Sequence, residues 1–305
     1  MSTHAARAAT QRGFLGSLMN PWAKARFLWV VALSYMIWTL VPVAIAVGFS
    51  FNAGKSQTAW QGFSLSRWYV DDVSSVWQDD SLRSALFQSL KLSTLTVLIA
   101  VPIGVAFGLA IDRWRGRVSR GSNMIMLFSF ITPEIAVGVA LFLYFTQLAT
   151  LVGLGLTAQV LGLSMYEIAY PVIIVQARLL SIGKEYEEAA MDLGASPIQA
   201  LRRVLLPLLA PAIVASVGIV FATSIDNFVI SQRLSIGAST QTVPILIYST
   251  ARTAPLPSLN ALATITLFAS TLMIAIAGLA LRGASRRDRG RAAATAKIGL
   301  PVPGD

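Results

Sequence analysis

Two acidic residues lie deep inside apolar stretches of this 305-residue chain. Asp226 lies well inside a long apolar run at 208–232, and Glu134 directly follows Pro133 near the middle of another run. A carboxylate at membrane depth is costly, and it usually faces a partner or a water-filled path. Because no lysine or arginine shares the centre of either run, the two acids would suit a cationic solute. Phe228 could add a cation–π contact worth about 0.5–2 kcal/mol.

Structural roles are the alternative for these acids. Glu134 fits the first turn of a helix restarted by proline, where the helix dipole favours an acid. Asp226 could instead cap a bend or pair with Arg233, about two helical turns further on. Glu167 lies near the predicted outer end of another apolar run, where we expect it to start a helix. Broken helices are common at transporter sites, so one acid can serve both purposes.

Motifs for catalysis or metal binding do not stand out. The sequence has no cysteine and a single histidine, His4, which lies in a polar basic tail. The tripeptide Gly54-Lys55-Ser56 looks like the end of a phosphate-binding loop, but Phe49 stands where that loop requires glycine. We therefore expect no catalytic, cofactor-binding or metal-binding residues, and an intramembrane enzyme is a weak hypothesis.

The elements that must position these acids are membrane helices. Hydrophobic residues make up 55% of the chain and charged residues 12%, with a mean hydropathy of +0.67, which is not the composition of a soluble protein. Several uncharged windows of about 20 residues are long enough to cross a bilayer as helices. The sequence predicts an all-α polytopic membrane protein with six transmembrane helices at about 27–51, 92–111, 122–148, 158–180, 208–232 and 259–281. These form one domain, 27–282, between a basic tail at 1–26 and a tail at 283–305 that we expect to be disordered.

The distribution of basic residues predicts the orientation of the helices. Lysine and arginine gather in both tails, in the loop at 112–121 and around 178–203. The predicted loops on the other side hold fewer of them. Positive charge stays on the cytoplasmic side of a membrane, so both the N and C termini should be cytoplasmic. The net charge of +10 is then a matter of topology, and we expect no nucleic-acid partner.

The longest charged interruption is the segment 187–207, EEAAMDLGASPIQALRRVLLP. Residues 188–193 favour a helix, Gly194 offers a C-cap and Ser196-Pro197 a new helix start, while Pro207 is expected to close the unit. A short amphipathic helix between two spans is suited to docking on another protein. An ordinary helix lying in the membrane interface is the alternative.

This segment resembles the cytoplasmic coupling loop of the membrane permease subunits of bacterial ATP-binding-cassette (ABC) importers. The loop of that family reads Glu-Ala-Ala, three residues, Gly, nine residues, Ile, one residue, Leu-Pro. The chain has Glu188-Ala189-Ala190, Gly194, Val204 and Leu206-Pro207 at this spacing, with valine in place of isoleucine. The resemblance implies the fold of a type I ABC importer permease. It also implies a coupling loop at 181–207 that contacts the ATPase through Glu188, Ala189, Ala190, Asp192 and Gly194.

A second set of residues resembles the spermidine/putrescine branch of these permeases. The stretches 224–231, 243–244 and 260–264 match it, and Thr132-Pro133-Glu134-Ile135 resembles its Ser-Pro-Asp/Glu-Ile. That branch commonly has a second acid where this chain has Asn227. The resemblance implies polyamine import, with Asp226, Glu134, Phe228 and Asn227 on the substrate path. The same machine for ferric ion, thiamine, a phosphonate or an opine is the alternative, and an ATPase-independent secondary transporter or channel is a more distant one.

The resemblance further implies the partners of the chain. They are a second homologous permease subunit, two cytoplasmic ABC ATPase subunits, an extracytoplasmic solute-binding protein and membrane lipid. ATP and magnesium would bind on the ATPases, so this chain would carry no cofactor and would not be an enzyme. Closure of the ATPases would act through the helices at 181–207 and rock the spans between inward and outward states. The implied location is the bacterial cytoplasmic (inner) membrane, which the chain crosses several times.

Overall fold

The computed structural model describes residues 26–56, 58–113, 131–252 and 257–297, together with 121, 124 and 128. These residues are almost entirely helical, and their one isolated β-bridge joins Asn52 to Phe63. Most of the tail at 1–26, the loop at 114–120 and residues 298–305 lie outside this part of the chain. The predicted all-α class is therefore confirmed for the described residues.

Five helices in the described part of the chain are long and apolar enough to cross a membrane. They contain α2 (Arg26–Phe49), α3 (Asp80–Arg113), α6 (Leu156–Glu167) continued by α7 (Ala169–Ile182), α10 (Leu206–Ile225) with the turns before it, and α13 (Ser258–Lys297). Part of the predicted third span, 122–148, lies outside the described residues. The rest is not one long helix, because Pro133 separates residue 131 from the shorter α5 (Glu134–Leu143), which a π-helical turn extends to Leu148.

Two predicted boundaries were wrong. Helix α10 ends at Ile225 instead of continuing to residue 232, and a separate helix, α11 (Val229–Leu234), follows it. Helix α13 continues to Lys297, so residues 283–297 are helical and the expected disorder does not begin at 283. No proline or glycine lies near Ile225, which explains why the end of α10 was not predicted, whereas Gly283 lies at the other predicted boundary and α13 runs through it.

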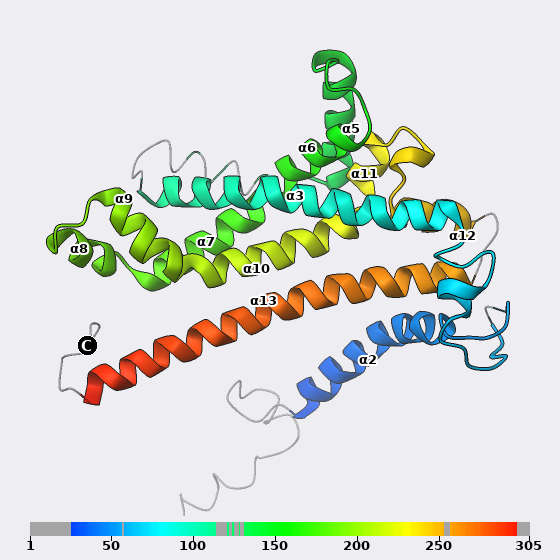
Figure 1. The fold of residues 1–305 in the computed structure, drawn as a ribbon, viewed down its shortest axis with the longest axis horizontal. Helices are drawn as coiled ribbons and strands as arrows, with labels where there is room; N and C mark the ends of the chain where they lie inside the picture. Colours follow the sequence, from blue (N-terminus) through cyan, green and yellow to red (C-terminus); the bar gives the residue numbers. More distant parts are fainter. Residues whose placement is uncertain are drawn as a thin grey trace, which may run out of the picture.

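The centre of the molecule is a stack of α3, α7, α10 and α13 (Figure 1). Glycines allow these helices to approach closely, as small residues commonly do in membrane proteins. A Cβ atom added at Gly104 of α3 would lie 2.4 Å from Cγ of Pro171 and 2.9 Å from the carbonyl oxygen of Ile168. On the other side of the stack, a Cβ at Gly218 of α10 would lie 2.8 Å from Cβ of Ala277.

Helices α5, α6 and α11 form a second group beside α3 (Figure 1). One buried residue of α6, Gln159, ties this group together and is 0% exposed. Its side-chain NH₂ group donates to the carbonyl oxygens of Ser231 at 2.9 Å and Thr240 at 3.0 Å, and its Oε1 accepts from Gln88 of α3 at 3.3 Å. A single side chain therefore ties α11 (Val229–Leu234) to the 3₁₀ turn at Ala238–Thr240, which precedes the next helix, α12 (Val243–Ala251).

The connection between α2 and α3 folds around Trp68, which is 1% exposed. Its indole Nε1 donates to the carbonyl oxygen of Asn52 at 2.6 Å. Asp79 closes this connection by accepting from the backbone N–H groups of Ser81 and Leu82, as an N-cap residue does. Burial raises the pKa of Asp79, but these hydrogen bonds outweigh burial and hold the pKa below its ordinary value.

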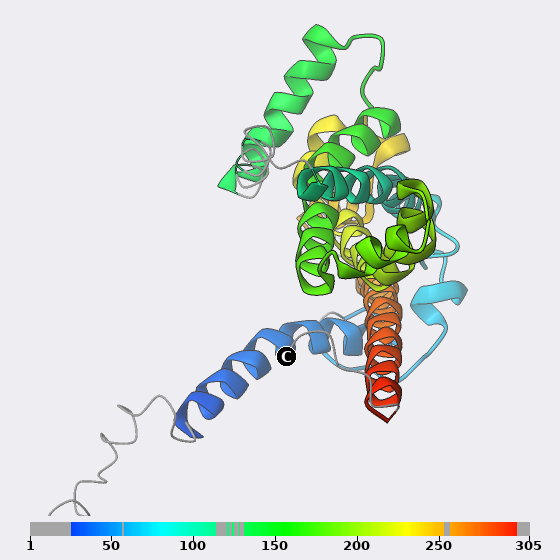
Figure 2. The same cartoon turned by 90° about the vertical axis from the view of Figure 1, so that its left-hand side faces the viewer.

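Helix α2 stands apart from the other long helices. The C-terminal end of α2 packs on α13, and α2 diverges from α13 toward the N-terminal end of α2 (Figure 2). The most apolar 18-residue window of this helix buries nothing within the chain. Its apolar side chains therefore need lipid or another protein to cover them.

Candidate functional site

Asp226 is the C-cap of α10, where the helix stops. Its side chain is exposed, and within the described part of the chain it makes no hydrogen bond or ion pair. The pairing with Arg233 that was considered for Asp226 is not formed. The alternative of a helix bend is confirmed, because three residues separate the end of α10 from the start of α11.

Asn227 precedes Phe228, the N-cap residue of α11, and its side chain accepts hydrogen bonds from the first turn of that helix. Its Oδ1 accepts from the backbone N–H groups of Ile230 at 3.2 Å and Ser231 at 3.3 Å, while its Nδ2 donates to Oε1 of Glu134. Glu134 begins α5 directly after Pro133, so its helix-start role is confirmed. Glu134 makes no ion pair within the described part of the chain, but its carboxylate accepts a hydrogen bond from the neutral amide of Asn227.

The predicted position of Glu167 at the start of a helix was wrong. It was expected to start a helix at the outer end of a span, but it lies in the middle of the continuous segment formed by α6 and α7. Its side chain is 1% exposed, and its Oε2 accepts from Oγ of Ser224 at 2.6 Å. Pro171, four residues later, removes the N–H that would bond to the carbonyl of Glu167, which accounts for the break between α6 and α7.

These contacts hold the chain on both sides of Asp226. Glu167 engages Ser224, two residues before it, and Glu134 engages Asn227, the residue after it. The two engaged acids fix the backbone where α10 ends. Asp226 is then left with a carboxylate that can interact with something outside the fold.

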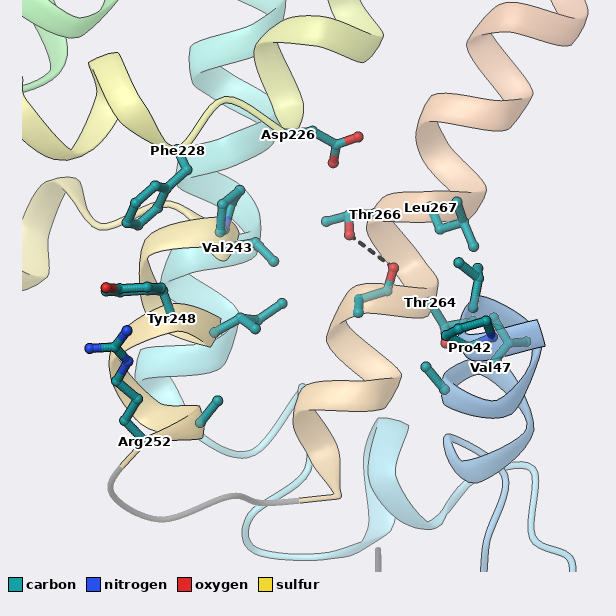
Figure 3. Close-up of a pocket in the computed structure, with 16 residues that line it drawn as sticks. Pro42, Val47, Asp226, Phe228, Val243, Tyr248, Arg252, Thr264, Thr266 and Leu267 are labelled. Atoms are coloured by element: carbon teal, nitrogen blue, oxygen red, sulfur yellow. Dashed lines mark hydrogen bonds between the residues drawn. The ribbon is translucent and has the colours of Figure 1, made fainter. Parts of the chain in front are cut away.

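A cavity of about 780 Å³ lies beside Asp226 (Figure 3). Its walls come from α2, α12 and α13 as well as from the break that holds Asp226 and Phe228. Most of the lining is apolar, with the hydroxyl groups of Thr264 and Thr266 on α13. Asp226 and Arg252 are its two charged residues, one of each sign. A mostly apolar cavity with a few polar groups is the usual form of a small-molecule site.

Aromatic and guanidinium groups form a column along α12 within this lining. The rings of Phe228 and Tyr248 have centroids 4.7 Å apart with an interplanar angle of 47°. Cζ of Arg252 lies 4.4 Å from the centroid of the Tyr248 ring. Figure 3 shows the three side chains on one side of α12, with the carboxylate of Asp226 on the other side, toward α13.

The segment at 181–207 that resembles the coupling loop (the coupling segment) lies at the opposite end of the helix stack from α12 (Figure 1). Helix α8 (Glu185–Asp192) contains Glu188, Ala189, Ala190 and Asp192 and buries none of its residues. Gly194 has φ +88°, which a residue with a side chain rarely adopts. The predicted helix–glycine–helix pattern is therefore confirmed.

A short helix, α9 (Pro197–Ala200), follows Gly194. Ser196 and Gln199 form a reciprocal capping box at its start. Pro207 does not close the unit as expected, because a π-helical turn at Leu201–Leu205 leads directly into α10 and Pro207 lies in its first turn. The coupling segment is thus continuous with the helix that ends at Asp226.

The surface of the coupling segment is both apolar and acidic. Leu193 is 91% exposed and Ile198 64%, and Glu188 is also exposed. On the other face of α8, Glu187 pairs with Arg113 at the end of α3. Exposed apolar side chains of this size favour contact with another protein.

The helix stack, the broken helix and the uncovered coupling segment together define the membrane subunit of a transporter. Residues 100–287 match the model of the family described as "Binding-protein-dependent transport system inner membrane component". This stretch is more than half of the chain, and the chain belongs to that family. The resemblance drawn from residues 188–207 is thereby confirmed.

Similar proteins include polyamine permeases. The "Putrescine transport system permease protein PotI" of Escherichia coli K12 is 30% identical over 256 residues, which cover 82% of this chain and 89% of PotI. The "Spermidine/putrescine transport system permease protein PotC" of the same strain is 30% identical over 250 residues, covering 82% of this chain and 92% of PotC.

Among solved structures, a bacterial ABC transporter that imports the acidic polysaccharide alginate has a chain with a TM-score of 0.63 and 18% identity. The match covers 85% of this chain and 95% of that one. The same kind of transporter in complex with a periplasmic protein bound to an alginate pentasaccharide gives a TM-score of 0.64, at 17% identity, with 82% and 92% covered. At this identity the likeness establishes the fold.

Membership of the family settles the general class of the protein. The chain is a non-catalytic, multi-pass permease component of an ABC importer in the inner membrane. A permease of this kind works with an ATPase and with a solute-binding protein. The permease fold of the importer structures is also the fold of this chain.

Proposed function

We propose that this chain is the transmembrane permease subunit of an importer for polyamines such as spermidine or putrescine. The observation that carries the proposal is the unpaired carboxylate of Asp226 beside a largely apolar cavity. The similarity to putrescine and spermidine/putrescine permeases over most of the chain supports the same solute class. Polyamines are flexible chains of methylene groups between ammonium groups, and such a cavity offers both an acid and apolar walls.

In this proposal the solute is held by two kinds of contact. One ammonium group pairs with Asp226, whose carboxylate no other residue of the described chain engages. A second ammonium group can lie against the ring of Phe228 or Tyr248, because aromatic faces attract cations. Asn227 and Glu134 then support the path indirectly, since together they hold the first turn of α11 and fix the break. The methylene groups meet the apolar walls from α12 and α13.

Transport would be driven from the coupling segment. Glu188 provides a polar contact to the ATPase, Ala189 and Ala190 permit close approach, Gly194 sets the turn, and Asp192 lies beside it. Two ABC ATPase subunits, a second homologous permease subunit and an extracytoplasmic solute-binding protein complete the complex. Because the turns after Gly194 run without interruption into α10, a movement of the segment would reach Asp226 along one helix.

The orientation in the membrane is part of the proposal. Six spans place both termini and the coupling segment in the cytoplasm, with the cavity nearer the outer side. A reporter fused after Asp305 should then give a cytoplasmic signal. A periplasmic signal would contradict both the span count and the position of the coupling segment.

The decisive test is uptake by the reconstituted complex. The chain, its partner permease, the ATPases and the cognate binding protein are placed in proteoliposomes, and ATP-dependent accumulation of labelled putrescine and spermidine is measured. Thermal-shift screening of the binding protein against polyamines, amino acids, metals and phosphonates identifies the solute independently. Uptake of polyamines without the ATPases would contradict the coupling mechanism.

The same importer for a different solute is the second candidate. Asn227 replaces an acid that is common in the polyamine branch, and Arg252 adds a positive charge to the lining of the cavity. An opine or a phosphonate, which carries negative charge, would use this guanidinium. Stabilisation of the binding protein by such a compound, and not by putrescine or spermidine, would favour the second candidate over the first.

A further inference from the structure

Arg252 occupies the aromatic face that a cationic solute would use. Its Cζ lies 4.4 Å from the centroid of the Tyr248 ring, within the range of a cation–π contact. The guanidinium is exposed and lines the same cavity as Asp226. Within the described part of the chain, it has no ion pair and no hydrogen bond to a carboxylate.

A second arginine, Arg67, also lies on an aromatic ring, but additional contacts hold it in place. Cζ of Arg67 lies 5.3 Å from the centroid of the Trp68 ring, and NH2 of Arg67 lies 3.8 Å from Oδ2 of Asp72. Trp68 is fully packed and is hydrogen-bonded to Asn52. Arg67 is thus held by an acid and a buried ring, whereas Arg252 is held by a half-exposed ring alone.

We propose that Arg252 is a tethered competitor for the solute. When the cavity is empty, its guanidinium occupies the face of Tyr248. A cationic group of the solute displaces it, and after release of the solute the guanidinium returns. The step involves no covalent change, since one cation replaces another on the same ring.

Two physical consequences follow from this arrangement. An exposed cation–π contact is weak, so a solute that binds Asp226 through one ammonium group can displace Arg252 from Tyr248 with a second one. The displaced guanidinium adds a positive charge near the solute and weakens its binding, which helps the solute to leave. Arg252 therefore lowers the affinity of the cavity for cations, and Tyr248 is the residue through which it acts.

Cysteine labelling measures binding in the cavity without the binding protein. The chain contains no cysteine, so Thr264→Cys on the α13 wall is a unique labelling site. In the detergent-solubilised complex, labelling of this cysteine by a maleimide is followed as putrescine or spermidine is added. The concentration that protects half of the sites is compared between Thr264→Cys alone and Thr264→Cys with Arg252→Gln.

We expect Arg252→Gln to lower the half-protecting concentration by about two- to fivefold, the factor that corresponds to one exposed cation–π contact. Arg252→Lys, which keeps a cation near the ring, should stay close to the parent. Arg67→Gln, which removes the other stacked arginine, should leave the concentration unchanged. Tyr248→Leu should raise it and should remove the difference between arginine and glutamine at position 252.

The outcomes separate this inference from the proposed function on which it rests. If the reconstituted complex imports polyamines but Arg252→Gln leaves protection unchanged or weakens it, Arg252 is not a competitor. Polyamine import without any protection of the cysteine would also overturn the inference, because the solute would not visit this cavity. If the complex imports no polyamine at all, the proposed function itself fails.

Discussion

Replacing Gln159 by leucine should destabilise the fold without changing any charge. The substitution keeps the size of the side chain, but it removes the donor to the carbonyl oxygens of Ser231 and Thr240. A buried polar group left without a partner costs about 1–3 kcal/mol. Two carbonyls would then cost about 2–6 kcal/mol, and the lower half of this range is expected because leucine itself needs no partner.

The assay is the free energy of unfolding of the purified chain in mixed micelles, obtained by titration with sodium dodecyl sulfate. Gln88→Leu is the matched control, because it removes only the longer bond of 3.3 Å, which is part-buried. That variant should lose about 1–3 kcal/mol, because it leaves one buried acceptor, Oε1 of Gln159, without a partner, whereas Gln159→Leu leaves two. If Gln159→Leu were as stable as Gln88→Leu, the two carbonyls would not depend on Gln159, and our account of the α11–α12 connection would be wrong.

Four further predictions concern coupling, the path, packing and pH. Glu188→Lys should uncouple ATP hydrolysis from uptake while the chain still inserts, and normal uptake in this variant would remove the docking role of Glu188. Asp226→Asn should reduce polyamine uptake more than Glu167→Gln does, since glutamine can still accept from Ser224; equal losses would count against Asp226 as the solute contact. Gly104→Val should lower stability by at least about 1–3 kcal/mol, the cost of overpacking, because its Cβ would meet the backbone carbonyl of Ile168 between α6 and α7, and an unchanged unfolding titration would argue against that close approach. The pKa of Asp79 is lower in the folded protein than in the unfolded chain, so the stability that Asp79 contributes is present above its unfolded pKa and is lost as pH falls through its folded pKa. Asp79→Asn should therefore make the free energy of unfolding fall less steeply with decreasing pH. If both proteins lost stability equally at low pH, protonation of Asp79 would not be coupled to unfolding.

The coupling segment could be predicted in detail because its signals are local. Ser196, Pro197 and Gly194 each act on the backbone of their immediate neighbours, and the structure uses all three as expected. Pro207 misled the prediction because a proline in the first turn of a helix is compatible with a preceding helical turn.

The candidate site could be predicted only in part because its contacts join distant parts of the sequence. Asp226 and Glu134 were recognised as unusual acids from their apolar surroundings alone. That Glu134 is engaged by Asn227 depends on a contact between α5 and the start of α11, which no local pattern encodes. The position of Glu167 had a usable local signal, since Pro171 follows it by four residues and marks a break.

The environment of Arg252 also depends on contacts between distant parts of the sequence. In the sequence Arg252 follows an apolar stretch, and no local pattern pairs it with Asp226. Only the packing of α12 against α13 and the break after α10 places it in the lining of a cavity with Asp226. Spacing along one helix could not have revealed this neighbour.

One wall of the cavity is α2, a helix that the rest of the chain leaves almost uncovered. The width of the cavity therefore depends on whatever presses on α2 from behind, whether acyl chains, detergent or a neighbouring subunit. Affinities measured in short-chain detergent, in long-chain detergent and in native lipid should not be treated as one constant. The surrounding solvent is in this sense a component of the binding site.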